Sequence, residues 1–492
     1  MRRALMAALA ATALAGCTLE PPYVRPTPAI PTAWPAGGAY PSAAAEALPS
    51  VSYRDVFKDP HLQAVIDLAL ARNQDLEAAM ANVEIARAQY RVQRAAQFPQ
   101  VDANASASVG QGRDQTTVVG GTGGGTVGGG SSGSSASNSR VTTRDYQANI
   151  SLSSFEIDLF GRLRSLTHAA REQYLASEAG AHAARLTLVG EVADAYLTYA
   201  ADSSLLAIAV QTMASAQRTV DLTEARLSGG VAPRTDLTSA QTLLDQARSD
   251  RASLTTQVAQ DRNALELLVG ATVPDADLPA SIESVDGLLG EVPAGLDSRI
   301  LLRRPDVAEA EYSLRAANAQ IGAARAAFFP SINLTGLAGF ASPQLSSLFS
   351  GSRFVWQAEG AATQTIFDGG ANAGNLAMAK GQRHLALAQY QKAIQSAFRD
   401  VADALARRGT MTEQVAAQTA LQAAANDSYT LSLARYREGI DPYLDTLDAQ
   451  RTLYSANQTL ASTRLIRAEN LVALYQALGG DQLVDALPPP KS

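Results

Sequence analysis

Long stretches of the chain repeat their apolar residues every seven positions, which is the spacing of a coiled-coil seam. The region 162–228 contains no proline, and alanines follow three positions after several of its heptad residues. At about 1.5 Å per residue, a helix over this region would be roughly 100 Å long and would have to pack in a bundle. The region 371–437 predicts a second helix of the same length, with a looser heptad. The heptad residues of the first region are Val192, Tyr199, Leu206, Met213, Val220 and Leu227.

Four further segments alternate apolar with polar or small residues, which is the period of a β-strand. They come in two pairs, 101–109 with 145–155 and 332–340 with 353–364. Segments of roughly ten alternating residues are a weak signature of transmembrane strands, and a half-exposed hairpin shows the same pattern. After the N-terminal region, no stretch approaches the roughly 18 apolar residues that indicate a transmembrane helix. A membrane-spanning form of the chain would therefore use its strands.

These helices and strands occur in two copies of one plan. The segments ARLSGGVAPRTDLTSAQTLL (225–244) and ARYREGIDPYLDTLDAQRTL (434–453) align at a constant shift of 434 − 225 = 209 residues. Glycine permits a chain reversal that other residues resist, and proline suits the start of a helix. We therefore expect each long helix to end in the same kind of turn and to be followed by a partner helix. The turn residues that keep this register are Gly230, Pro233, Gly439 and Pro442.

The two copies predict the organisation of the whole chain. Each copy reads helix, strand, loop, strand, long helix, turn, helix, and a link with several prolines separates them. In order, the parts are a signal peptide (1–16), an N-terminal extended segment (17–59), repeat 1 (60–270), a link that forms part of an equatorial belt (271–300), repeat 2 (301–480) and a C-terminal tail (481–492).

Composition places the chain with folded proteins and argues against two function classes. Of its 492 residues, 46% are hydrophobic and 18% are charged, and the net charge of −7 provides no basic surface for nucleic acid. The Gly- and Ser-rich segment 120–139 lacks the Gly-Lys-Ser/Thr ending of a phosphate-binding loop. We expect no enzyme, metal or cofactor, because the histidines show neither metal-ligand spacing nor a Ser/His/Asp arrangement. They are His61, His168, His182 and His384.

The single cysteine, Cys17, follows a positive start, an apolar run and the tripeptide Leu-Ala-Gly. The residues before it have the pattern of a secretory signal peptide. A free thiol beside a discarded segment is one interpretation of Cys17. Leu-Ala-Gly-Cys, however, resembles the bacterial lipobox, whose cysteine becomes the acylated mature N-terminus. The position of the only cysteine favours lipidation, which anchors a protein without spanning the membrane.

Counting strands predicts an oligomer. Two copies with two strands each supply four strands, whereas bacterial outer-membrane barrels have at least about eight. An open sheet edge in lipid would leave backbone groups unpaired. Two chains would give eight strands around an interior filled by side chains, and three would give twelve around a water-filled channel. Small residues such as Ser106 and Ser151 favour an open interior, which suits three chains better than two.

Several separate motifs resemble one known family. Besides the lipobox and the repeated turn, they are LLRRPDVAEAEYSLRAANAQIGAARAAFFPSINLTG (301–336), FEIDLFGRLRS (155–165) and TIFDGGA (365–371). Together they resemble the TolC-type outer-membrane efflux channels, in particular the lipoprotein branch of tripartite RND-type drug-efflux systems. The resemblance implies a mainly α fold with a small β part. In that fold a long α-helical coiled-coil barrel joins four transmembrane strands per chain, which complete a twelve-stranded barrel in a homotrimer.

The resemblance also implies a function and partners. The protein would be anchored in the lipid of the bacterial outer membrane, with its helical tunnel in the periplasm. It would be a passive, gated conduit that exports drugs or other small molecules. A periplasmic adaptor and an inner-membrane RND-type transporter would be its partners, and the transporter would supply the energy. No cofactor and no nucleic acid are implied.

Two aspartates after the second turn correspond, by the same resemblance, to residues that ring the narrow periplasmic entrance of the channel. They are Asp445 and Asp448, which are three positions apart and so share a helix face. Six carboxylates in a trimer would repel anions and attract cations. Capping or complementation of the helix dipole is an alternative role for Asp445 and for its counterpart Asp236.

Residues that close the entrance are also implied. Asp236 resembles the family residue that ties the two turns together, with Tyr436 as its partner and Arg435 as a further closing contact. Asp441 stands where the family has an arginine of the closing network, so we expect its negative charge to weaken the closed state. Arg435 and Arg437 are both candidates to replace that arginine.

Two other functions fit parts of this pattern. One is the outer-membrane exit duct of a type I protein-secretion system, and the other is a lipid-anchored coiled-coil adaptor without a pore. The lipobox and the RRPDV motif favour drug efflux over protein secretion. The four alternating strands argue against the adaptor.

Overall fold

The computed structural model describes residues 18–28, 30–31, 33–40, 52–113, 140–285 and 298–483. Cys17 and the segment 120–139 lie outside these residues, so lipidation and the solvated loop remain predictions. The chain divides into two compact units, and each contains parts of both sequence copies. The first consists of 1–21, 90–168 and 318–380, and the second of 22–89, 169–317 and 381–492.

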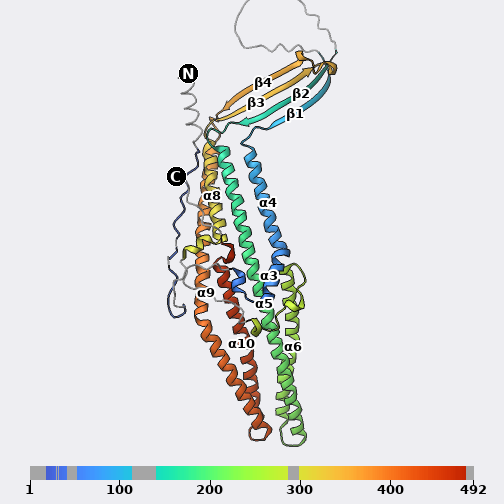
Figure 1. Ribbon diagram of the computed structural model, residues 1–492, viewed down its shortest axis with the longest axis vertical. Helices are drawn as coiled ribbons and strands as arrows, with labels where there is room; N and C mark the ends of the chain where they lie inside the picture. The colour runs from blue at the N-terminus through green and yellow to red at the C-terminus, as the bar shows by residue number, and fades with distance from the viewer. Residues whose placement is uncertain are drawn as a thin grey trace, which may run out of the picture. The chain divides into compact units, whose positions relative to one another are not determined.

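Each copy contains a helix, two strands, a long helix and a second helix in that order, and the first copy begins with one additional helix (Figure 1). The two long helices are each 67 residues, as their uninterrupted patterns predict. The first copy contains α3 (Pro60–Arg72), α4 (Gln74–Ala95), β1 (Val101–Arg113), β2 (Arg140–Glu156), α5 (Arg162–Ser228) and α6 (Arg234–Val269). The second contains α8 (Pro305–Ala326), β3 (Ser331–Ser342), β4 (Phe354–Thr363), α9 (Ala371–Arg437) and α10 (Tyr443–Ala477). Short helices α2 (Tyr53–Val56) and α7 (Ile282–Val285) lie outside this pattern.

The four strands form one antiparallel sheet in the order β1-β2-β3-β4. This confirms all four segments expected from the alternating pattern. The register between β2 and β3 shifts between Leu152 and Phe155, where β2 carries a bulge. Strands β1 and β4 are the edges of this sheet, and each has one side that pairs with no described strand. Such edges are templates for pairing with another chain.

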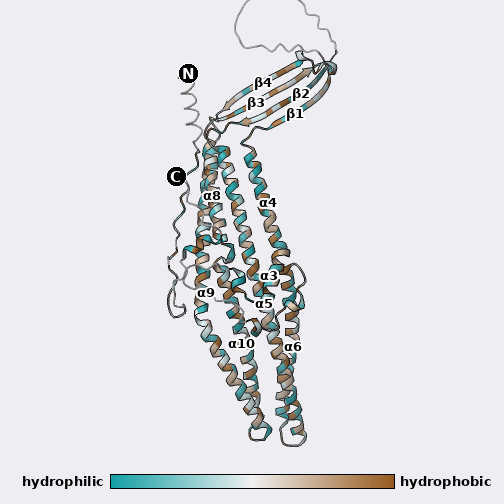
Figure 2. Cartoon of the chain, in the orientation of Figure 1, coloured by the Kyte–Doolittle hydropathy of each residue, from teal (hydrophilic) through white to brown (hydrophobic). Residues whose placement is uncertain are grey.

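The long helices are not apolar along their length. Figure 2 shows hydrophilic and hydrophobic residues interleaved over them. Among the described residues, no helix combines the length and the apolar character needed to cross a membrane.

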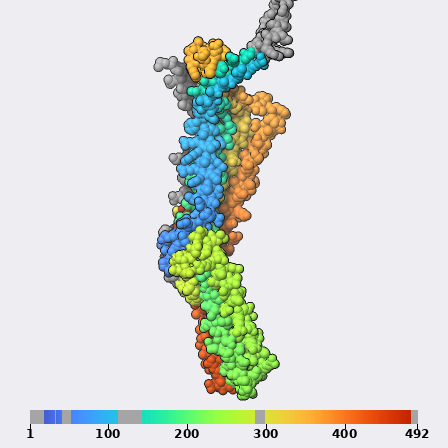
Figure 3. Space-filling view, turned by 90° about the vertical axis from the view of Figure 1, so that its right-hand side faces the viewer, coloured from blue at the N-terminus to red at the C-terminus, as the bar shows by residue number. Residues whose placement is uncertain are grey.

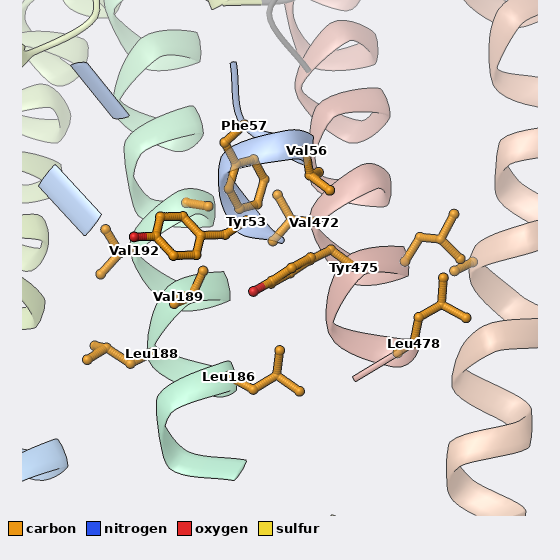
Figure 4. Packing of buried hydrophobic residues seen from close by; sticks show 14 of the residues in the cluster. Tyr53, Val56, Phe57, Leu186, Leu188, Val189, Val192, Val472, Tyr475 and Leu478 are labelled. Carbon is orange, nitrogen blue, oxygen red and sulfur yellow. The ribbon is translucent and has the colours of Figure 1, made fainter. Parts of the chain in front are cut away.

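The main hydrophobic core of the second unit lies where α2 meets α5 and α10 (Figure 4). Phe57 packs edge-on against Tyr475 with ring centroids 5.5 Å apart, and both rings are fully buried. Val192, one of the heptad residues, is fully buried in the same cluster. Full burial of a large apolar side chain contributes about 1.5–3 kcal/mol. This cluster therefore holds the first-copy and second-copy helices together.

An extended N-terminal segment packs against the second unit. Arg25 forms an ion pair of 2.8 Å with Glu311, which is fully buried, and Trp34 stacks on Phe398 with centroids 5.0 Å apart. Ser298 donates a hydrogen bond of 3.0 Å to the carbonyl of Pro31. A buried carboxylate requires such a partner, because unpaired burial of a charge is costly. The segment is thus part of the folded unit.

Candidate functional site

The two long helices end in turns with the same hydrogen bonds. In the first turn (residues 229–233), Val231 N–H donates to the carbonyl of Arg226 and Gly230 N–H to that of Leu227. In the second turn (residues 438–442), Ile440 and Gly439 make the equivalent bonds to the carbonyls of Arg435 and Tyr436. This is the Schellman motif, which needs a left-handed residue after the helix. Gly230 and Gly439 supply it with φ of 74° and 75°.

Each turn leads into the next helix through a proline. Pro233 and Pro442 are the N-cap residues of α6 and α10, one position before the first helical residue, and both have extended backbone angles. Asp236 and Asp445 lie in the first helical turns that follow. A carboxylate at that position interacts favourably with the positive N-terminal end of the helix dipole. The dipole role expected for both residues is therefore compatible with their positions.

A buried cluster joins the two turns within the second unit. It contains residues of α5, α6, α9 and α10, and its aromatic centre is Tyr436 beside Tyr443, with ring centroids 5.3 Å apart. Both tyrosines are at most 2% exposed, and neither hydroxyl has a hydrogen-bond partner among the described residues. Burial raises the pKa of Tyr443. Figure 3 shows that α6 covers one face of this part, with second-copy helices visible only along its edge.

Arg226 is the residue that connects the two turns directly. Its Nη1 donates a hydrogen bond of 2.7 Å to the backbone carbonyl of Tyr436, at the end of α9. Its guanidinium carbon lies 4.7 Å from the centre of the Tyr436 ring, which is a cation–π arrangement. The charge-assisted bond is the stronger kind of hydrogen bond. The first turn thus holds the second through one arginine.

Arg435 pairs with an acid of the second turn. Its guanidinium forms a double hydrogen bond with Asp441, including Nη2 to Oδ1 at 2.8 Å, so its carboxylate partner lies within its own turn rather than at Asp236. The hydrogen bond from Arg435 lowers the pKa of Asp441. Since Arg435 accompanies Asp441, the charge of this aspartate is balanced inside the second turn.

Asp236 is partly buried, and its burial raises its pKa while the charge of Arg226 acts in the opposite direction. Arg226 is therefore the cation that acts on Asp236. Sequence reasoning missed this role, although the register contained a signal. Arg226 aligns with Arg435, and the position that aligns with Asp441 is Ala232. The first turn contains no acid at that position, and Arg226 instead donates to a backbone carbonyl at the second turn.

Asp445 and Asp448 are exposed on α10. Neither forms an ion pair with any residue that the structure describes. The charge of Asp445 acts on Arg435, which places the two side chains near each other. One chain therefore presents two solvated carboxylates on one helix face beside the second turn.

The described part of the chain contains no group of three or more His, Cys, Asp or Glu residues placed to hold a metal ion. Three of the histidines contact other side chains instead: His61 contacts Asp277, His168 contacts Glu20, and His182 contacts Gln482.

Comparison with known proteins finds close relatives over nearly the whole chain. The probable efflux pump outer membrane protein TtgC of Pseudomonas putida is 42% identical over 97% of this chain and 95% of its own. The outer membrane protein OprJ of Pseudomonas aeruginosa is 38% identical over 96% of this chain and 95% of its own.

Comparison with solved structures also finds membrane proteins that are similar over nearly the whole chain. The open state of the MtrE outer membrane channel of Neisseria gonorrhoeae has a TM-score of 0.79 and 35% identity, and the match covers 96% of this chain and all of MtrE. A membrane protein from Pseudomonas aeruginosa has a TM-score of 0.84 and 36% identity. The model of the family described as outer membrane efflux protein matches residues 65–271 and 296–480. The chain belongs to the outer membrane efflux protein family.

Proposed function

We propose that this chain is the outer-membrane channel of a tripartite efflux pump, a passive and gated conduit for drugs or other small molecules. The observation that carries the proposal is similarity over at least 95% of the chain to proteins named as efflux pump outer membrane proteins. The paired long helices with matching turns suit a tunnel wall, and the sheet suits the part that enters the membrane.

Three copies would form the working channel. The sheet of one chain has two free edges, β1 and β4, and an edge exposed to lipid would leave its backbone groups unpaired. Pairing β4 of one copy with β1 of the next satisfies both edges, and three sheets of four strands then enclose a wide, water-filled space. The acylated Cys17 would anchor each copy to outer-membrane lipid.

The partners follow from the same function. A passive conduit in the outer membrane requires an inner-membrane transporter, here of the RND type, to supply energy. A periplasmic adaptor would join the transporter to the helical end of the channel. We also propose that the repeats are bounded at 60–270 and 301–480, which the two matched segments of the family model support.

The entrance would lie at the two turns. In a trimer, Asp445 and Asp448 of each copy would form a ring of six carboxylates that favours cations. The contact of Arg226 with Tyr436 would hold the turns together in the closed state, with Asp236 adding its charge beside Arg226. Opening would require this contact to break.

Conductance in a planar bilayer tests the proposal with the full-length protein and Asp445→Ala/Asp448→Ala. We expect small, cation-selective openings that lose most of their selectivity in the double variant. Glu77→Ala/Glu84→Ala, which removes two exposed acids from α4, is the matched control and should keep the selectivity. Selectivity unchanged by the aspartate variant would limit Asp445 and Asp448 to stabilising the helix. Folded protein that conducts nothing, even with Arg226→Gln, would favour the anchored coiled coil without a pore.

A further inference from the structure

The strand pairs β1–β2 and β3–β4 are equivalent residue for residue. A shift of 334 − 103 = 231 residues converts β1 into β3, and a shift of 360 − 150 = 210 residues converts β2 into β4. These shifts convert the residue pair Ala103–Ile150 into the residue pair Leu334–Gly360. The contacts that join β2 to β3 within the chain therefore predict the contacts that would join β4 to β1 of a second copy.

The junction where β2 meets β3 extends beyond the two strands. Ile157, directly after β2, donates its N–H to the carbonyl of Ile332 at 2.8 Å. The ring of Phe160 stacks on the ring of Phe329, which precedes β3, with centroids 4.6 Å apart. Ile157, Phe160 and Phe329 all line one small cavity of about 120 Å³. Three apolar side chains therefore meet at this junction.

At the free edges β1 and β4, the equivalent residues are exposed (Figure 1). Phe367 and its neighbour Ile366 are each 90% exposed. Val101 is 65% exposed and Phe98 is 59% exposed. Large apolar residues gathered at an unpaired strand edge indicate an interaction surface. The equivalent residues are Phe367 for Ile157, Val101 for Ile332 and Phe98 for Phe329.

One residue distinguishes the second junction from the first. Asp158 and Asp368 are equivalent, and both accept backbone hydrogen bonds from the start of a long helix. Three residues separate Asp158 from α5, whereas two glycines separate Asp368 from α9, so the Phe160 ring has no counterpart there. Phe367 instead supplies a ring at the position of Ile157, which borders the same cavity as Phe160.

We propose that β4 of one copy pairs with β1 of the next in the register of β2 with β3, and that Phe367 packs on Phe98 of that next copy. The N–H of Phe367 would donate to the carbonyl of Val101, and its ring would cover Phe98. The occupant of this surface is a second copy, because the contact continues the pairing of the free edges. The inference rests on the three-copy assembly of the proposed function and adds its register and contact residues.

The register makes one strand pairing directly testable. The residue pair Ala148–Phe340 between β2 and β3 converts into Ala358 of one copy opposite Val109 of the next. A slip by one residue would turn every side chain of one strand to the other face of the sheet. A slip by two would place Ala358 opposite a different residue on the same face, so the two registers can be told apart.

Cysteine cross-linking of the full-length protein tests this register. Ala358→Cys/Val109→Cys should form disulfides between copies under mild oxidation, because opposite strand residues have Cα atoms about 4.5–5.5 Å apart. Denaturing gels should then show bands of two and three linked copies. A link within one chain is excluded, because β1 and β4 are opposite edges of a four-stranded sheet, about 14 Å apart.

Ala358→Cys/Ala107→Cys is the matched control. Its two cysteines face the same side of the sheet but lie diagonally, about 7–8 Å apart, so the linked bands should be lost. Each single cysteine variant should also give no linked bands. The single variants retain Cys17 and therefore measure any link that involves this residue.

Thermal dissociation of the trimer in detergent tests the aromatic contact. Phe367→Ala and Phe98→Ala should each lower the dissociation temperature by several degrees. The double variant should lower it no further, because either change removes the same contact. Leu345→Ala removes an exposed apolar side chain from the connection between β3 and β4, and should leave the dissociation temperature unchanged.

Light scattering of the unchanged protein separates this inference from the proposed function. Particles of fewer than three chains would overturn both. Trimers in which the control pair links as readily as Ala358→Cys/Val109→Cys would overturn the register alone. Additive effects of Phe367→Ala and Phe98→Ala would overturn the aromatic contact. Trimers with the expected links that conduct nothing would count against the conduit and support this contact.

Discussion

Arg226 at the end of one long helix donates a 2.7 Å hydrogen bond to the backbone carbonyl of Tyr436 at the end of the other, and its guanidinium lies over the ring of the same tyrosine. The two residues are 210 positions apart. The same carbonyl also accepts the Gly439 N–H bond that closes the second turn. One carbonyl therefore serves both the turn and the contact between the two copies.

Replacing Arg226 should loosen this contact. Arg226→Gln removes the charge-assisted hydrogen bond and the cation–π contact, which together stabilise by about 2 kcal/mol. We expect a lower melting temperature and, in planar bilayers, more frequent or larger openings. Arg226→Lys keeps the charge but not the planar group, so its effect should be intermediate. Openings unchanged in Arg226→Gln would show that other contacts hold the turns together.

The stability of the helical part should depend on Asp194. This residue lines a cavity of about 880 Å³ between α5, α8, α9 and α10, where burial and then the charges of Glu469 and Glu191 raise its pKa to about 7. One of its oxygens is buried without a hydrogen-bond partner in the described residues. Since the folded-state pKa exceeds the unfolded value near 4, the folded state binds the extra proton between those values. Stability should therefore fall as pH rises from about 4 to 7.

Asp194→Asn tests this dependence. The variant should be more stable than the unchanged protein at pH 8, by up to about 4 kcal/mol, and the difference should shrink at pH 4. Urea unfolding followed by circular dichroism at both pH values measures it. Asp427→Asn, at an exposed acid of α9, is the control and should change little. A stability difference for Asp194→Asn that stays the same at pH 4 and pH 8 would contradict the assignment.

The turn glycines should resist replacement. Gly439→Ala places a side chain in the left-handed region, which costs about 1–2 kcal/mol, and Gly230→Ala should cost about the same because its φ is the same within 1°. Gly381 lies inside α9 with open space around its Cβ position, so Gly381→Ala should raise stability by up to about 1 kcal/mol. Melting temperatures of the three variants give the comparison. A Gly439→Ala variant as stable as Gly381→Ala would rule out the need for a left-handed residue.

Local patterns in the sequence determined the framework of this protein. The absence of proline over 162–228 and 371–437 predicts both long helices, and the strand segments predicted from alternation are all present. Gly230 and Gly439 predict the turns. These features depend on neighbouring residues along the chain, since helix ends, strand faces and left-handed turns are governed by local backbone preferences. The repeat can also be recognised from the sequence, because the two turn segments align at a constant shift.

The partners of the arginines were decided only by the tertiary structure. Arg226 and Arg435 occupy equivalent positions, yet Arg226 crosses to the carbonyl of Tyr436 while Arg435 turns back to Asp441. A long, charged side chain reaches several acceptors, and which one it binds depends on segments that folding brings near it. The contact of Tyr436 with Tyr443 has the same origin, because helices of both copies must pack before the cluster around it exists. Sequence determined the elements, and packing determined which of their polar groups meet.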